Sequence, residues 1–211
     1  MNSIFNKKWV NKEQSLDLNI FQNLLKSRGI IDAEDVQNYL APSYKKGFHN
    51  PFLMKDMEKA VNRIKQAAAS GERVIVFGDY DVDGISGTAV LVKALTLYGV
   101  NVSYRLPHRV NDGYGLNIKF IDEFIEKGIK LVITVDCGIS CKAQIDLAKA
   151  NNIDVIITDH HTIPEQIPDK AYAILHPLQS DCPYPFKGLT GSGVAYKLAT
   201  ALLTEKFTGE E

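Results

Sequence analysis

Short apolar runs alternate with segments of helical spacing from about residue 73 to residue 175. The predicted strands lie at 73–78, 101–106, 130–135 and 153–158, of which the first, third and fourth are apolar runs, and the helical patterns lie near 86–98, 117–127 and 140–150. Such alternation predicts βαβ units and a parallel sheet, whose central strands are apolar throughout because both faces are covered. A short strand at 172–175 and a helix near 192–205 complete the pattern. The sequence therefore predicts an α/β, doubly wound fold with a mainly parallel sheet and helices on both faces.

The first part of the chain has a different pattern, without predicted strands. Segments 16–25 and 32–40 have helical apolar spacing, and a longer amphipathic helix is expected from 54 to about 70. One face of that longer helix carries Met57, Ala60, Val61, Ile64 and Ala67. We therefore expect a helical N-terminal segment at residues 1–52 and an α/β domain at residues 53–211.

Three of the apolar runs end on an aspartate, at Asp79, Asp136 and Asp159. Ligands of open parallel sheets bind beyond the carboxyl ends of the strands, so these acids should converge on one crevice. The first run continues into Asp81 and Asp83, and the third into two adjacent histidines. Carboxylates and imidazoles in one crevice predict a divalent metal site, and the oxygen-rich donor set favours magnesium or manganese.

The acidic loop at residues 79–84 fits other interpretations less well. Its D-x-D-x-D-G pattern matches the start of an EF-hand loop, but Val90 stands where the bidentate Glu should be and a strand precedes the loop. Residues 81–85 also match the nucleophile motif of haloacid-dehalogenase-type phosphatases, which gives the tandem histidines no role. Helix capping explains one acid per turn. Three carboxylates in five residues repel one another unless a cation neutralises them, so metal binding is favoured.

Composition adds few constraints. The chain has 211 residues, of which 45% are hydrophobic and 23% charged, as in globular proteins. With a net charge of -1, a nucleic acid would have to be bound by a local basic patch or by metal. No apolar stretch approaches the roughly 18 residues that span a bilayer, and we expect a cytoplasmic protein without membrane association. Cys137, Cys141 and Cys182 form no disulfide framework and are expected as packing residues.

The motifs at the strand ends resemble those of a known family. Residues 79–87, 135–138 and 158–161 are similar to the first three motifs of the DHH phosphoesterases, which are named after the Asp-His-His triplet. Segments 106–116 and 189–197 narrow the resemblance to the RecJ branch of exonucleases, and it covers nearly the whole chain. The resemblance implies a metal-dependent phosphodiesterase that degrades single-stranded DNA from the 5′ end in DNA repair and recombination.

The resemblance also implies roles for individual residues. The implied ligands of Mn²⁺ or Mg²⁺ are Asp81, Asp83, Asp136 and His160, with Asp79 beside them, and the implied catalytic residues are Asp136, His160 and His161. Contacts with DNA or its phosphates are implied for His108, Arg109, Tyr114, Gly191 and Ser192. Phe77 stands where many family members have a histidine, which removes one ligand of the second metal.

Further expectations concern partners and the extent of the chain. The resemblance implies single-stranded DNA as the substrate, with a single-strand-binding protein and a helicase as candidate protein partners. The family's fourth motif supplies another Asp ligand and is followed by a second domain, so the chain resembles an amino-terminal part of such an enzyme. Two alternatives stay open. One is a DHH phosphoesterase acting on short oligonucleotides, cyclic dinucleotides or pyrophosphate, and the other is a catalytically silent scaffold in a replication or repair complex.

Overall fold

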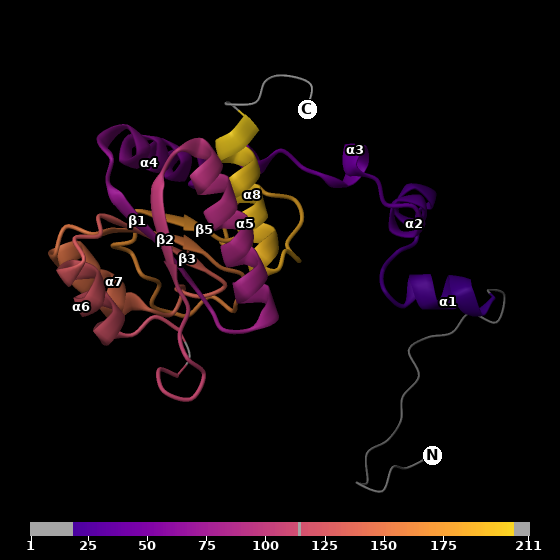
Figure 1. The fold of residues 1–211 in the computed structure, drawn as a ribbon. Helices are drawn as coiled ribbons and strands as arrows, with labels where there is room; N and C mark the ends of the chain where they lie inside the picture. Colours follow the sequence, from indigo (N-terminus) through magenta and orange to yellow (C-terminus); the bar gives the residue numbers. More distant parts are fainter. Residues whose placement is uncertain (1–18, 114, 205–211) are drawn as a thin grey trace, which may run out of the picture. The chain divides into compact units, whose positions relative to one another are not determined.

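The computed structural model describes residues 19–113 and 115–204, and its tertiary contacts divide these residues into two compact units (Figure 1). The division lies between Phe48 and His49, whereas the sequence pattern places it after residue 52. The first unit contains the short helices α1 (Ile20–Lys26), α2 (Ala33–Leu40) and α3 (Tyr44–Gly47). Asn19 caps α1 and Asp32 caps α2, so the expected helices are present, and residues 16–18 lie outside the described part.

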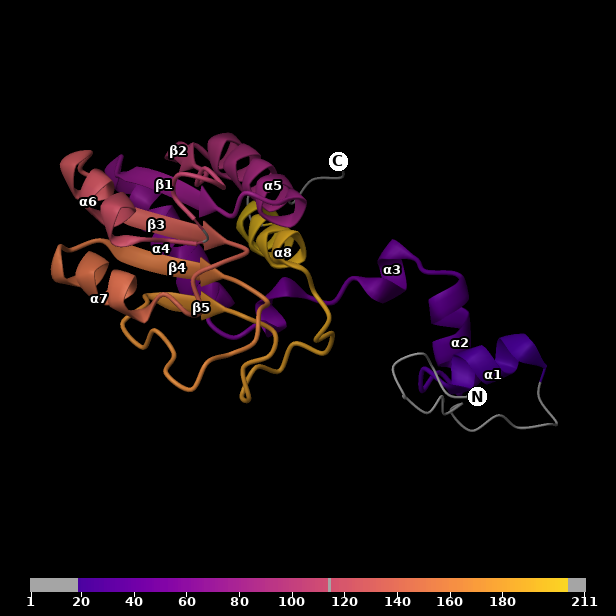
Figure 2. The same ribbon diagram turned by 90° about the horizontal axis from the view of Figure 1, so that it is seen from below.

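The second unit is built on a five-stranded parallel sheet (Figures 1 and 2). Its strands are β1 (Arg73–Gly78), β2 (Asn101–Arg105), β3 (Leu131–Val135), β4 (Asp154–Thr158) and β5 (Ala173–Leu175). The order is β2-β1-β3-β4-β5, and every neighbouring pair is parallel. The direction of winding reverses between β1 and β3, which is where open sheets of this kind bind ligands. The predicted fold class is confirmed.

Helices cover both faces of the sheet (Figure 2). One face carries the short helix η1 (Pro51–Leu53), α4 (Met57–Ser70), α5 (Val82–Tyr98) and α8 (Gly191–Thr204), and the other carries α6 (Ile118–Glu126) and α7 (Lys142–Ala150). Val76 packs into the first cluster and its neighbour Phe77 into the second, because successive side chains of a strand point to opposite faces. The predicted apolar face of α4 is buried. No helix in the described ranges is long and apolar enough to cross a membrane.

Helix α5 begins at Val82, earlier than the start near residue 86 that the sequence pattern suggested. The reason is that Asp81 is its N-cap residue, and its Oδ1 accepts hydrogen bonds from the backbone N–H groups of Asp83 and Gly84 (2.9 and 3.0 Å). Asp83 therefore lies in the first turn of the helix. Capping accounts for one oxygen of Asp81 without excluding a metal at the other.

The three cysteines are free thiols, and two of them, Cys137 and Cys182, are buried. Burial raises the pKa of the Cys137 thiol well above its ordinary value and also raises that of Cys141. These side chains are packing residues, as expected from the sequence.

Candidate metal centre at the carboxyl ends of the strands

The backbone at Asp136 is held in an unusual conformation. Asp136 follows β3 directly, its N–H donates to the carbonyl of Thr158 (2.9 Å), and its φ angle is 62°. A left-handed conformation costs a non-glycine residue roughly 1–3 kcal/mol and persists where the surrounding structure imposes it, often at functional sites. Asp79 continues the sheet in the same way, since its N–H donates to the carbonyl of Val135 (3.2 Å). The ends of β1 and β3 thus bring two acids together at the reversal of winding.

Asp79, Asp81 and Asp136 form one group of candidate ligands. One oxygen from each lies within 4.8 Å of the others, and Asp79 and Asp136 are only 2% exposed. Among the described residues, Oδ1 of Asp79 and Oδ1 of Asp136 have no hydrogen-bond partner. Burial, followed by the charges of Asp83 and Asp81, raises the pKa of Asp136 to about 7, and burial also raises the pKa of Asp79. Buried carboxylate oxygens without partners fit a divalent cation.

Asp136 also belongs to a second group, with His160 and His161, whose donor atoms likewise lie within 4.8 Å of one another. Nε2 of His160 is 3.1 Å from Oδ1 of Asp136 and 3.6 Å from Oδ2 of Asp83. The mixed set of imidazole and carboxylate donors suits manganese and zinc, and the oxygen-rich first group suits magnesium or manganese. Because Asp136 is common to both groups, its carboxylate would be a ligand for a cation held by either group. A carboxylate shared in this way is compatible with two-metal phosphodiester chemistry.

Asp159 organises the turn that carries the two histidines. Its Oδ1 accepts hydrogen bonds from the backbone N–H groups of His160 and His161 (2.7 and 3.1 Å), and its Oδ2 accepts one from Ile139 (2.9 Å). The same Oδ1 is 2.7 Å from Nδ1 of His161. An ionised carboxylate only accepts, so the proton of a neutral His161 is on Nδ1. Burial lowers the pKa of His161, but Asp159 more than offsets this and the net direction is upward.

Sequence reasoning placed Asp159 at a strand end but assigned it no role in the site. The available signal was its position directly before two histidines, because an Asp at the end of a buried strand can accept the next two backbone N–H groups. Its contacts identify it as the residue that orients His161, in the manner of the outer-shell carboxylates that orient metal-ligating histidines.

Asp83 is held by the N-terminus of α8. The N–H of Gly191 donates to Oδ2 of Asp83 (2.8 Å) and the N–H of Ser192 donates to Oδ1 (2.7 Å). Burial raises the pKa of Asp83, but the hydrogen bonds from Ser192 and Gly191 outweigh burial, so the net direction is downward. A Cβ at position 191 would lie 2.4 Å from Oδ1 of Asp136, so only glycine fits there. The sequence assigned this turn to DNA contact, which stays a prediction; the structure gives its amides a partner inside the protein.

The loop after β2 brings Arg109 to the same edge of the sheet. The Arg109 guanidinium lies 5.3 Å from the centroid of the Tyr80 ring, and its charge lowers the pKa of Asp79, which burial raises. His108 is engaged within the loop, where its Nδ1 accepts from the N–H groups of Val110 and Asn111 (both 3.3 Å). The structure therefore brings Arg109 to the acid cluster, whereas the imidazole of His108 stabilises the loop.

Two further predictions concern aromatic residues. Tyr114, expected to stack on a base, lies outside the described residues. Phe77 is fully buried, with its ring centroid 5.0 Å from that of Phe120 and 6.3 Å from that of Phe124. An aromatic residue therefore fills the core at the position where a histidine ligand is common in the resembling family.

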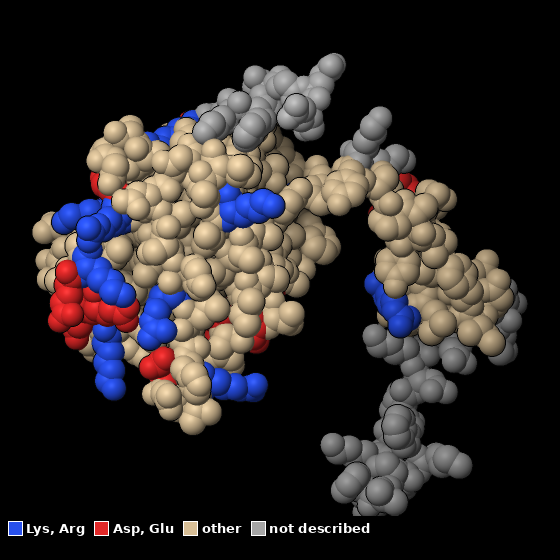
Figure 3. All heavy atoms as spheres, in the orientation of Figure 1, with Lys and Arg blue, Asp and Glu red and all other residues tan. Residues whose placement is uncertain are grey.

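Charged side chains gather over α6 and α7 on the face shown in Figure 3, with acidic and basic groups intermixed, whereas the surface over α5 is largely uncharged. On that face the described residues form no uniformly basic tract, in keeping with the net charge of -1. A phosphate backbone would therefore depend on local groups such as Arg109 and on bound cations.

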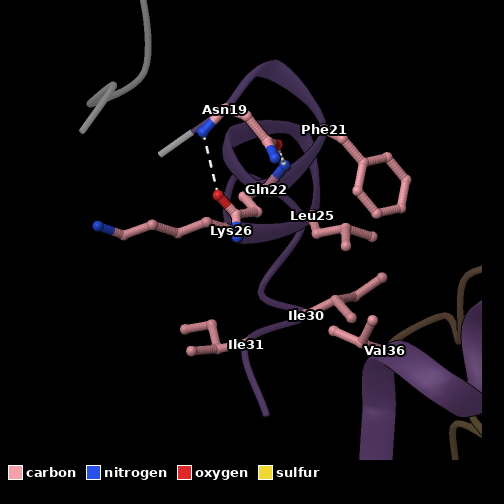
Figure 4. A pocket seen from close by; sticks show the side chains of 8 residues that line it. All are labelled: Asn19, Phe21, Gln22, Leu25, Lys26, Ile30, Ile31 and Val36. Atoms are coloured by element: carbon pink, nitrogen blue, oxygen red, sulfur yellow. Dashed lines mark hydrogen bonds between the residues drawn. The ribbon is translucent and has the colours of Figure 1, made fainter. Parts of the chain in front are cut away.

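A separate cavity of about 410 Å³ lies in the N-terminal unit (Figure 4). Its lining is mainly apolar, with Leu25, Ile30 and Val36 among the side chains drawn. The polar groups of Asn19 and Gln22 are engaged with each other in the capping box of α1. This cavity offers packing surface and no cluster of ionisable groups, so the candidate chemistry lies at the sheet.

Comparison with known proteins shows the family of the chain. The model of the DHH family, N-terminal domain, matches residues 73–211. The single-stranded-DNA-specific exonuclease RecJ of Bacillus subtilis is 43% identical over 183 residues, which are 87% of this chain and 23% of that protein. The chain thus spans about a quarter of the length of this relative.

Two solved structures share the fold. Exonuclease RecJ bound to manganese is 36% identical with a TM-score of 0.67, over 73% of this chain and 39% of that one. RecJ from Thermus thermophilus in complex with Mn²⁺ is 32% identical with a TM-score of 0.65, over 86% of this chain and 24% of that one.

Proposed function

The chain belongs to the DHH family, and on this premise we propose that it carries active-site residues of a metal-dependent exonuclease that degrades single-stranded DNA from the 5′ end. The observation that carries the proposal is Asp136, a buried carboxylate in a left-handed backbone conformation, whose Oδ1 accepts no hydrogen bond from the described residues and lies among further acids and 3.1 Å from His160. The specificity for single-stranded DNA in the name of the Bacillus subtilis relative supports the choice of substrate.

The donor set supports Mn²⁺ or Mg²⁺ as the cofactor. Asp83, Asp136 and His160 would hold one ion, and Asp79, Asp81 and Asp136 would hold a second. Such ions supply charge stabilisation at the phosphate oxygens and make a nearby water more acidic. The manganese in the two solved RecJ structures supports Mn²⁺ as the cofactor.

The chain's own residues would bind the phosphate and move a proton. Arg109, supported on the Tyr80 ring, would pair with a phosphate oxygen of the DNA. His161 keeps its Nδ1 proton toward Asp159, so its Nε2 would exchange a proton with the reacting groups, and its raised pKa favours donation to the leaving 3′ oxygen. The α8 amides keep the Asp83 carboxylate ionised and oriented toward His160.

The substrate test compares matched DNA molecules in the full-length protein. A 5′-phosphorylated single strand with an internal fluorophore should be shortened from its 5′ end when Mn²⁺ is present, and the same strand in a blunt duplex should persist. Release from the 3′ end, or equal digestion of the duplex, would contradict the proposal. Faster turnover of dinucleotides, cyclic dinucleotides or pyrophosphate would favour the first alternative, and tight manganese binding without any turnover would favour the scaffold.

The proposal extends to partners and location. An exonuclease for single strands depends on other proteins to expose them, so a helicase and a single-strand-binding protein are the proposed partners. We also propose a cytoplasmic location, which the specificity for single-stranded DNA named for the relatives supports. We further propose two domains, which the sequence pattern places at residues 1–52 and 53–211 and the tertiary contacts divide after Phe48; the family match from residue 73 supports the second as a DHH domain.

A further inference from the structure

His176 is a fully buried histidine that has no role in the proposed chemistry. It follows β5 directly and is 0% exposed. Its Nδ1 accepts a hydrogen bond from the N–H of Leu178 (3.1 Å), and its Nε2 lies 2.8 Å from the backbone carbonyl oxygen of His161. A ring nitrogen that accepts from an N–H carries no proton, so the proton of the neutral ring is on Nε2 and is donated to His161. Both nitrogens are thus satisfied in a single tautomer.

The carbonyl that His176 holds belongs to the turn of the two histidines. Asp159 fixes this turn on one side by accepting from the N–H groups of His160 and His161. His176 fixes it on the other side through the carbonyl of His161. Because Nε2 of His160 lies only 3.1 Å from the Asp136 carboxylate, a small rotation of the turn would change the geometry of the cluster.

The segment that starts at His176 also reaches Asp83. Lys187 donates to the carbonyls of Pro177 and Cys182 (2.9 and 2.8 Å), which closes the segment on itself, and Gly191 at its end donates to Asp83. One stretch of chain therefore supports the histidine turn at its start and the acidic loop at its end. Packing alone does not require this arrangement, since an apolar side chain such as that of its neighbour Leu175 fills a buried position without hydrogen bonds.

We propose that His176 is a positioning residue of the metal centre, which fixes the His160–His161 turn by donating Nε2–H to the carbonyl of His161. The inference rests on the proposed function for its kinetic consequence, but its effect on metal binding can be measured without any substrate. Loss of an outer hydrogen-bond partner of a metal site typically weakens metal affinity or activity about 10- to 100-fold.

Three variants of the full-length protein test the proposal by calorimetric titration with Mn²⁺. His176→Leu should bind Mn²⁺ about tenfold more weakly than the parental protein. His176→Asn should stay within about threefold, because its amide offers both an acceptor for Leu178 and a donor for His161. The matched control is Gln179→Leu, which removes side-chain hydrogen bonds to the carbonyls of Ile174 and His176 (2.8 and 3.4 Å) but leaves the contact with His161, and its affinity should be unchanged.

Kinetics give a second measurement. His176→Leu should lower kcat about tenfold with KM for DNA nearly unchanged, because the Arg109 loop is not touched. Parental affinity and kcat in His176→Leu, or equal losses in Gln179→Leu, would overturn the proposal. Absence of exonuclease activity in the parental protein would refute the proposed function alone, and the manganese titrations would still decide the role of His176.

If His176→Leu does not fold, the proposed hydrogen bond can be tested in the parental protein. A ¹⁵N spectrum of its imidazole groups should show His176 neutral, protonated at Nε2, with slow exchange of that proton. In His176→Asn the backbone ¹⁵N signals of His160 and His161 should move less than in any folded variant that cannot donate, such as His176→Val. A proton on Nδ1 of His176 would refute the proposed hydrogen bond.

Discussion

Charged side chains lie at both ends of the sheet, but the two ends differ in how these charges are paired. At the amino ends of the strands, Arg63 is 6% exposed, and its Nε and Nη2 donate to Asp154 and Glu72 (both 2.7 Å). Lys149 adds a second cation beside Asp154 (3.1 Å). At the carboxyl ends, Asp136 and Asp79 have oxygens without any hydrogen-bond partner in the described ranges.

The difference separates a structural ion network from a binding site. At the amino ends the Arg63 guanidinium faces the opposite charges of Asp154 and Glu72, so charge is neutralised within the protein, although its Nη1 has no hydrogen-bond partner among the described residues. At the carboxyl ends acidic groups predominate, with Arg109 and the two histidines beside them, and a cation from outside would neutralise the remaining negative charge. A buried charge does not by itself indicate a binding site. The charges of the side chains around it distinguish a binding site from a structural ion pair.

The largest effect is expected for Asp136→Asn, because it removes the charge that both ligand groups share. Asn tolerates the left-handed backbone and has the same shape, so the fold should be kept. Exonuclease activity should fall about a thousandfold, and the metal-free protein should become more stable to heat because repulsion among the acids is relieved. The measurement pairs single-strand digestion with a melting curve, and parental activity in this variant would refute the metal centre.

The pH dependence of stability should also reveal the raised pKa of Asp136. Its pKa is about 7 in the folded chain against an ordinary value of 3.8, so between these values the folded state binds a proton that the unfolded state has lost. This contribution to stability is fully present below about pH 4 and is lost as the pH rises through about 7, a change of roughly 4 kcal/mol. Melting temperatures without metal should therefore fall with pH more steeply in the parental protein than in Asp136→Asn, and saturating Mn²⁺ should remove the difference. Parallel curves would contradict the raised pKa.

Replacing Arg63 by Met tests the opposite end of the sheet. The substitution leaves Glu72 and Asp154 mostly buried without their main partner, and the free energy of unfolding should fall by about 3 kcal/mol. Urea denaturation measures this loss. Manganese affinity at low temperature should stay at the parental value, and a matching loss of metal binding would show that the two ends are not independent.

The smallest effect is expected for Lys149→Met, which is the matched control for Arg63→Met. The Lys149 side chain is about half exposed, so its ion pair with Asp154 is screened by water and should contribute less than about 0.5 kcal/mol. A loss as large as that of Arg63→Met in the same urea experiment would mean that the network, and not the buried guanidinium, stabilises this end.

Much of the fold followed from local patterns. The apolar runs predicted five strands because the central strands of a parallel sheet are apolar on both faces, and Asp79 and Asp136 were expected together because parallel strands end at one edge. The start of α5 was predicted too late, since the apolar spacing gives no sign that Asp81 caps the helix. The support of the site was missed: His176 acts through the backbone carbonyl of His161, which no residue pattern marks, and the position of Asp159 before two histidines was a signal that went unused.

The sequence by itself determined the α/β architecture, the edge of the sheet where the chemistry lies and the kinds of donor gathered there, since all three depend on residues adjacent in the chain. Only the tertiary structure decided which of the charges are neutralised. Asp83 receives the amides of α8 from 108 residues away, and Asp154 receives the guanidinium of Arg63 across 91 residues. Oδ1 of Asp136 receives no hydrogen bond from any described residue. A buried charge is neutralised or hydrogen-bonded by the distant segment that folds against it, and which segment does so depends on packing in three dimensions.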